Sequence, residues 1–74
     1  MAVNRITHLQ TEIAHLYMRR NGLTPAEFIA EDDKYGILRF IASGYEPFHV
    51  TGSDSVVEEL ENFIALKKTA AANN

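Results

Sequence analysis

Apolar side chains recur every three or four residues from the start of the chain, which is the spacing of one face of an α-helix. They are Val3, Ile6, Leu9, Ile13, Leu16 and Tyr17. Arg19 and Arg20 follow, where cations favour the carboxyl end of a helix, and Gly22 can adopt the left-handed conformation that ends one. The pattern predicts a long amphipathic helix that ends at Gly22.

The next segment contains the residues that begin a helix. Thr24 is a preferred N-cap, and Pro25 is suited to the first helical position. Glu27 is spaced to form a capping box with Thr24, and Leu23 can pack against Phe28 across the cap. These residues predict a second, short helix.

A third helix is predicted to begin at Asp32 or Asp33, where the acidic run ends the second helix, and to stop at Gly44. Its apolar residues cover much of its circumference and predict the most buried element of the fold: Tyr35, Ile37, Leu38, Phe40 and Ile41. Gly36 lies inside this helix, where glycine costs about 1 kcal/mol relative to alanine. A close approach by another backbone is therefore expected at Gly36.

Pro47 and Gly52 bracket a link, which is predicted to be irregular or extended because Phe48 and Val50 alternate with polar neighbours. A last helix is predicted to begin between residues 53 and 55. Its apolar face comprises Val56, Val57, Leu60, Phe63 and Ile64.

Ser55 and Glu58 have the spacing of a second capping box at the start of the last helix. The chain as a whole is predicted to be all-α, a compact bundle of about four helices with a short irregular or extended link before the last one. Residues 1–68 are expected to form a single helical domain, and residues 69–74 a frayed tail.

The size of the chain limits its core. A domain of 74 residues rarely gains more than about 3–5 kcal/mol from its core alone. The chain has no cysteine, so neither a disulfide nor a thiolate metal site can add stability. We therefore expect stabilisation by a bound partner or by a second copy, and no cofactor.

The net charge of −3 is distributed unevenly. Residues 1–22 have a net charge of +2. Residues 23–64 contain nine carboxylates and two basic residues, a net charge of −7, and Lys67 and Lys68 contribute +2. This acidic middle segment argues against a nucleic-acid backbone as partner and favours a basic protein. No apolar run is long enough to span a bilayer and no signal core is visible, so a cytoplasmic location with no membrane association is expected.

His8, Glu12 and His15 lie on one face of the first predicted helix. Glu12 and His15 have the spacing that carboxylate-bridged metal sites use inside helical bundles, but such sites need further inward-pointing carboxylates. Both histidines lie opposite the apolar stripe, so they should face water. We expect no metal site and no catalytic site, since the chain has no cysteine nucleophile and its candidate serines serve as caps.

Five residues are candidates for an interaction surface: Met18, Tyr45, His49, Glu58 and Glu61. Met18 falls outside the apolar arc of its helix, Tyr45 and His49 flank the corner before the last helix, and the two glutamates face away from the apolar side of that helix. In the alternative interpretation, Met18 and Tyr45 belong to the rim of the core. The ring nitrogens of His49 would then bond to the backbone of its turn.

The segment from Tyr35 to Ile64 resembles a family of small bacterial proteins catalogued as domain of unknown function 3791. The similarity rests on Tyr35-Gly36-Ile37-Leu38, Phe40-Ile41, Tyr45, Phe48-His49, Gly52, Val57-Glu58-Glu59-Leu60 and Phe63-Ile64. In that family the corner usually reads Tyr, an acid, any residue, Leu, His, Thr, Gln, Gly. Here Phe48, Val50 and Thr51 stand in place of Leu, Thr and Gln.

The resemblance implies a short helical protein, often encoded beside an ADP-ribosyltransferase-like toxin, and no catalytic residues. We therefore expect a non-catalytic protein–protein interaction module, antitoxin-like in a toxin–antitoxin system. It would cover a basic surface of a toxin-like partner with its acidic middle segment. The alternatives are a homodimeric structural or regulatory protein that associates through its first helix, and a small helix-turn-helix nucleic-acid binder. The stretch from Thr24 to Ile41 disfavours the last, because it holds four acids against two bases.

Overall fold

Within the residues that the structure describes, the chain is built from helices alone. The computed structural model describes the backbone of residues 2–72 and the side chains of residues 5–71. Its five helices are α1 (Ala2–Asn21), α2 (Pro25–Tyr35), α3 (Ile37–Ser43), α4 (Tyr45–Phe48) and α5 (Ser53–Ala72). The all-α prediction is confirmed. In this part of the chain no helix has the length and apolar character that crossing a membrane requires.

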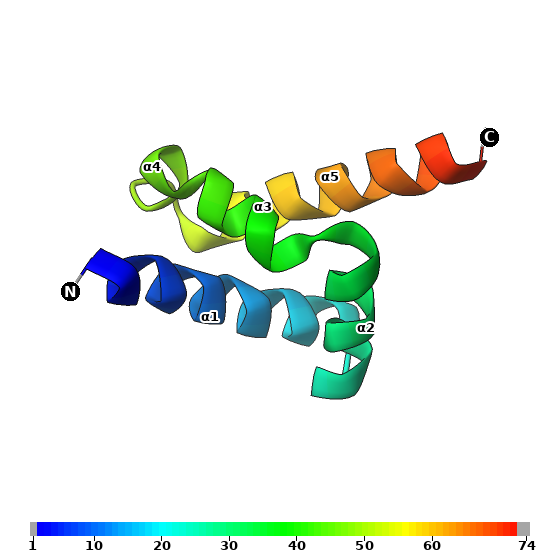
Figure 1. The fold of residues 1–74 in the computed structure, drawn as a ribbon, viewed down its shortest axis with the longest axis horizontal. Coiled ribbons are helices and arrows are strands. Elements are labelled where there is room, and N and C mark those ends of the chain that lie inside the picture. Colours follow the sequence, from blue (N-terminus) through cyan, green and yellow to red (C-terminus); the bar gives the residue numbers. More distant parts are fainter. Residues whose placement is uncertain (1, 73–74) are drawn as a thin grey trace.

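The two long helices, α1 and α5, run in the same direction, and α3 lies between them (Figure 1). The side-chain hydrogen bonds between α1 and α5 show the parallel register. The Ser53 hydroxyl donates to Glu12, and the Arg20 guanidinium donates to Glu61 at 3.2 Å. Both pairs are separated by 41 residues along the chain, which is the pattern of two parallel helices side by side.

The core lies where the apolar faces of α1, α3 and α5 meet. Its buried members are Leu9, Ile13, Ala14, Tyr17, Phe28, Tyr35, Ile37, Ile41, Val56, Val57, Leu60 and Ile64. The apolar stripe predicted for the first helix supplies Leu9, Ile13 and Tyr17 to this core. These three positions are buried within one copy of the chain, whereas Ile6 and Leu16 of the same stripe are half-buried.

Polar contacts also connect α1 to α2 and α3. The Gln10 amide donates to the carbonyl of Leu38 at 2.8 Å, and the Tyr17 hydroxyl donates to the carboxylate of Glu31 at 2.7 Å. Burial, followed by the hydrogen bond and the charge of Glu31, raises the pKa of Tyr17. A phenol is protonated at neutral pH in any case, and the raised pKa keeps Tyr17 a hydrogen-bond donor at higher pH as well.

The predicted start of the second helix is confirmed, but its predicted end is wrong. Thr24 and Glu27 form the capping box, with both hydrogen bonds present. The helix does not stop at the acidic run; it continues through residues 31–33 to Tyr35, and Gly36 separates it from α3. Acidic side chains do not break a helix, whereas a left-handed glycine does.

Gly36 does not have the role that its position in the sequence suggested. It lies between two helices and not inside one, with φ 71° and ψ 46°. A Cβ added there would meet nothing within 4 Å, so no backbone approaches it closely. Asp32 does contribute to the start of α3, because its carboxylate accepts the Leu38 amide at 2.8 Å. Glycine at position 36 is explained by its left-handed conformation.

Gly36→Ala should lower the free energy of unfolding by about 1–2 kcal/mol, because an L-residue is strained in this conformation. Urea denaturation followed by circular dichroism measures the change. Gly36→Asn should cost less, since asparagine tolerates the left-handed region better than alanine does. Equal losses for the two variants would contradict the conformational explanation.

The link that Pro47 and Gly52 bracket is irregular over residues 49–52, as predicted, but its first two residues belong to the helical turn α4, so the prediction is wrong at Pro47 and Phe48. Pro47 is the third residue of α4, where a missing N–H costs no intrahelical hydrogen bond. Phe48 packs against Phe40 with ring centroids 5.5 Å apart. Val50 does not alternate inward, since 76% of it is exposed.

The last helix begins at Ser53, so Ser55 lies in its first turn and not at its cap. The predicted capping box of Ser55 and Glu58 is therefore wrong. The helix continues to Ala72. The side chain of Val3 and residues 73–74 of the predicted tail lie outside the described residues.

Candidate interaction site

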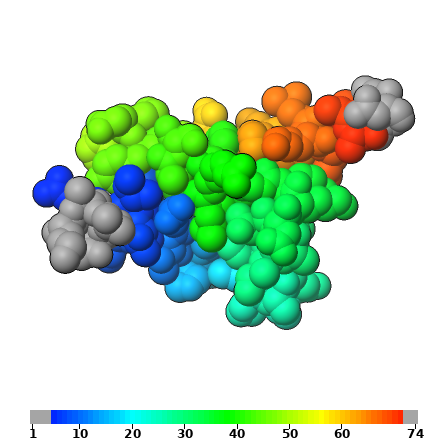
Figure 2. Space-filling model, viewed as in Figure 1, coloured from blue at the N-terminus to red at the C-terminus, as the bar shows by residue number. Residues whose placement is uncertain are grey.

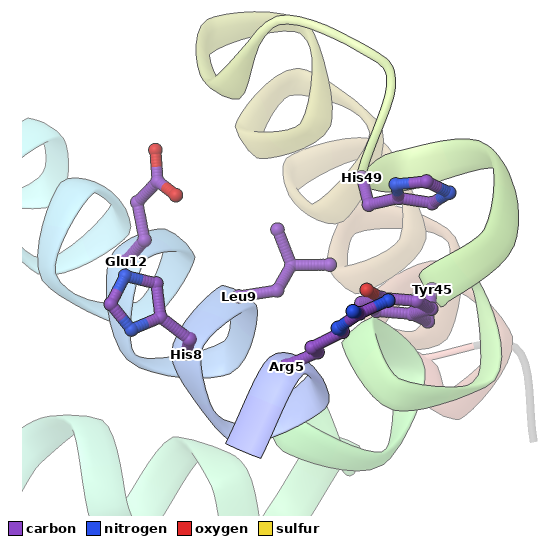
Figure 3. A pocket seen from close by; sticks show the side chains of 6 residues that line it. All are labelled: Arg5, His8, Leu9, Glu12, Tyr45 and His49. Atoms are coloured by element: carbon purple, nitrogen blue, oxygen red, sulfur yellow. The ribbon is translucent and has the colours of Figure 1, made fainter. Parts of the chain in front are cut away.

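A cleft of about 400 Å³ lies between the first half of α1 and α4 (Figure 3). Six residues line it: Arg5, His8, Leu9, Glu12, Tyr45 and His49. The first four occupy consecutive turns of α1, and the other two lie one turn apart at α4. Two helices that are distant in sequence thus combine aromatic, basic and acidic groups in one concave surface.

The wall contributed by α4 is a stack of two rings. The rings of Tyr45 and His49 lie 4.8 Å apart with an interplanar angle of 10°. The His49 amide donates to the Tyr45 carbonyl at 2.9 Å, which holds the two side chains on the same side of the turn. The His49 ring lies 3.8 Å from the carboxylate of Glu46. Among the described residues, no hydrogen bond joins the ring nitrogens of His49 to the backbone of the turn, in contrast to the alternative interpretation. The stacking with Tyr45 positions the ring instead.

The wall contributed by α1 is polar apart from Leu9. Arg5 points from α1 toward Tyr45, and Glu12 lies at the other end of the cleft (Figure 3). The carboxylate of Glu12 is held in place by the hydroxyl of Ser53. This arrangement offers stacking and charge-assisted hydrogen bonds, which are the contacts of a recognition surface.

His8 and His15 are both exposed, as the sequence predicted. His8 lines the cleft together with Glu12 and His49, and His15 does not. In the part of the chain that the structure describes, no three His, Cys, Asp or Glu side chains are grouped closely enough to hold a metal ion.

The five candidate residues do not form one patch. Tyr45 and His49 meet in the cleft, and Glu58 is exposed on α5. Glu61 accepts hydrogen bonds from Arg20 at 3.2 Å and from Asn21 at 3.1 Å, near the far end of α1.

Met18 is half-buried and packs against the core, so core packing explains why it interrupts the polar side of α1. Its position is nine residues beyond Leu9, about 14 Å along the helix axis, which separates it from the cleft. Arg5 and Leu9 are the lining residues that sequence reasoning did not single out. Nothing in their spacing on α1 indicates that α4 packs beside them.

These features define a small all-α domain with an aromatic and charged cleft between its first helix and a short helical turn. Residues 9–67 match the family described as Protein of unknown function (DUF3791), and the chain belongs to that family. The match includes the segment from Tyr35 to Ile64 and extends over most of α1. No curated protein and no solved structure matches the chain significantly.

Proposed function

We propose that this protein is a non-catalytic protein–protein interaction module, the antitoxin-like partner of an ADP-ribosyltransferase-like toxin, acting in the cytoplasm. The ADP-ribosyltransferase-like class of the toxin is what the resemblance to the DUF3791 family implies. The observation that supports an interaction role is a stripe of carboxylates along α5, formed by Asp54, Glu58 and Glu61, hereafter the acidic stripe. These residues are spaced i, i+4 and i+7, so they share one face of the helix.

The acidic stripe is incompletely neutralised. Asp54 and Glu58 are exposed, and among the described residues neither has a cation within ion-pair distance. Glu61 alone is paired, with Arg20. A row of unpaired carboxylates attracts a basic surface and accelerates its association.

The stripe and the cleft are adjacent. Glu12 lines the cleft and accepts the hydroxyl of Ser53, which immediately precedes Asp54. A partner that covers the acidic stripe and extends across the cleft from Glu12 would also contact the stacked rings of Tyr45 and His49. Aromatic side chains provide much of the binding energy at protein interfaces, while exposed charges set rate and specificity.

The proposal predicts a complex between this protein and the toxin-like product of the neighbouring gene. The two proteins should co-purify after co-expression, and this protein should restore growth to cells that express the toxin. The association rate should fall as salt is raised, because exposed charges are screened. Failure both to co-purify and to restore growth would end the proposal.

A charge-matched pair of variants tests the acidic stripe itself. Asp54→Asn with Glu58→Gln should weaken binding about tenfold at low salt, since each exposed pair contributes up to about 1 kcal/mol. Ala26→Lys with Ala30→Lys changes the net charge equally but places it on exposed positions of α2. Equal weakening by both double variants would show a general charge effect and not a docking surface.

A further inference from the structure

α5 passes the joint between α2 and α3 (Figure 1, Figure 2). A second concave surface lies at this joint. It consists of two adjoining clefts of about 330 and 210 Å³. Both are lined by Tyr35, Gly36, Arg39 and Lys67. We refer to these two clefts together as the basic groove. It shares no lining residue with the cleft beside α4.

The basic groove gathers cations from two distant parts of the sequence. Lys34, Arg39 and Lys67 line it, and the Nζ of Lys68 lies 5.8 Å from the centroid of the Tyr35 ring. These are four of the seven Lys and Arg residues in an acidic chain. All four are exposed, and among the described residues none is paired with a carboxylate.

Carboxylates neutralise this charge only in part. Asp32 and Asp33 line the same end of the groove. One oxygen of Asp32 is engaged by the Leu38 amide at 2.8 Å. The groove therefore keeps an excess of positive charge, although the chain as a whole has a net charge of −3.

The floor of the groove is aromatic. Tyr35 is buried, and the rings of Phe40 and Phe63 stack with centroids 4.2 Å apart. The ammonium group of Lys34 lies 5.5 Å from the centroid of Tyr35, and that of Lys67 lies 5.0 Å from the centroid of Phe63. These ring faces hold the ammonium groups over the groove. Among the described residues no carboxylate lies within ion-pair distance of them.

We propose that the basic groove binds a compact polyanion, a pyrophosphate- or triphosphate-type group, either free or as part of a nucleotide. Clustered ammonium groups and a guanidinium are the side chains that bind phosphate oxygens. The volume of the larger cleft lies in the range of small-molecule sites. An extended polyanion such as nucleic acid fits less well, because beyond the groove it would meet an acidic surface.

Titration calorimetry of the isolated protein tests this directly, with inorganic tripolyphosphate and ATP as the two ligands. Both should bind if the phosphates alone are recognised, whereas clearly tighter binding of ATP would show that the base also contacts the groove. Sodium sulfate at equal ionic strength is the control and should not reproduce the effect. Because no toxin is present, the outcome is independent of the function proposed above.

Identical substitutions at two exposed arginines provide the matched variants. Arg39→Gln should weaken tripolyphosphate binding about tenfold, the usual size of one charge-assisted contact. Arg19→Gln, on α1 outside the groove, should leave it unchanged. Lys67→Gln should resemble Arg39→Gln, and thermal unfolding should show that all three variants are folded.

Several results would overturn the proposal. The first is no binding of either phosphate ligand, which would leave the lysines as partners of the aromatic rings alone. The second is equal weakening by Arg39→Gln and Arg19→Gln. The third is tighter binding of a single-stranded oligonucleotide or of an Asp- and Glu-rich peptide than of ATP, which would assign the groove to a macromolecule.

Discussion

Ile41→Ala should destabilise this protein by about 2–5 kcal/mol, because it leaves a cavity at a fully buried site. Ile41 is 0% exposed and lies on α3, between the two long helices. A core of this size supplies only about 3–5 kcal/mol in total. The variant should therefore be largely unfolded at 25 °C, with loss of helical circular dichroism and no cooperative thermal transition.

The same substitution at an exposed position is the control. Ile29 lies on α2 with 61% of its surface exposed. Ile29→Ala should leave the free energy of unfolding within about 0.5 kcal/mol of the parent, since no cavity forms and alanine favours the helix. If the two variants were equally stable, α3 would not be the centre of the core.

Gly44→Ala is expected to have the second largest effect, a loss of about 1–3 kcal/mol from overpacking. A Cβ at this position would lie 2.7 and 2.8 Å from two ring atoms of Phe48, and closer still to Cε2. The ring cannot simply move away, because it is half-buried against Phe40. Urea denaturation should show a lower midpoint with an unchanged slope.

Gly52→Ala is the matched glycine control. Its backbone is not left-handed, and a Cβ there would meet nothing within 4 Å, so no steric loss is expected. Gly52 precedes α5 and its carbonyl accepts the Val56 amide, so alanine at this N-cap should cost only about 0.5 kcal/mol. A double-mutant cycle identifies the cause of the loss at Gly44. In a Phe48→Leu background the ring is absent, and Gly44→Ala should cost much less. A cost that persists without the ring would rule out the steric explanation.

The helices α1 and α2 could be predicted from the sequence because their signals are local. The 3.6-residue period of α1 and the capping box of Thr24 and Glu27 involve side chains within one turn of each other. Each of these segments therefore favours a helix through its own side chains, before any contact with the rest of the chain. The sequence-based prediction fails at a boundary: the second helix continues through the acidic run and ends at the left-handed Gly36.

The glycines show the limit of local reasoning. Gly36 was expected to allow a close approach and instead adopts a left-handed conformation with open space around it. Gly44 was expected only to stop a helix, yet it is the position where a ring comes too close for a Cβ. The sequence marks both as special. The sequence does not show whether glycine is required for a left-handed backbone conformation or for a close packing contact. The contact at Gly44 arises only because α4 places the ring of Phe48 beside it.

By itself, the sequence determined that the chain is all-α, where its second and last helices begin, and that its middle segment is acidic, since composition and neighbours within one turn decide these properties. Only the tertiary structure decided which side chains meet. It places Arg5 and Glu12 of α1 in one cleft with the stacked rings of Tyr45 and His49. It also brings the lysines of α5 to the joint between α2 and α3. Both surfaces depend on how helices distant in sequence pack together, and the burial of the shared core sets that packing.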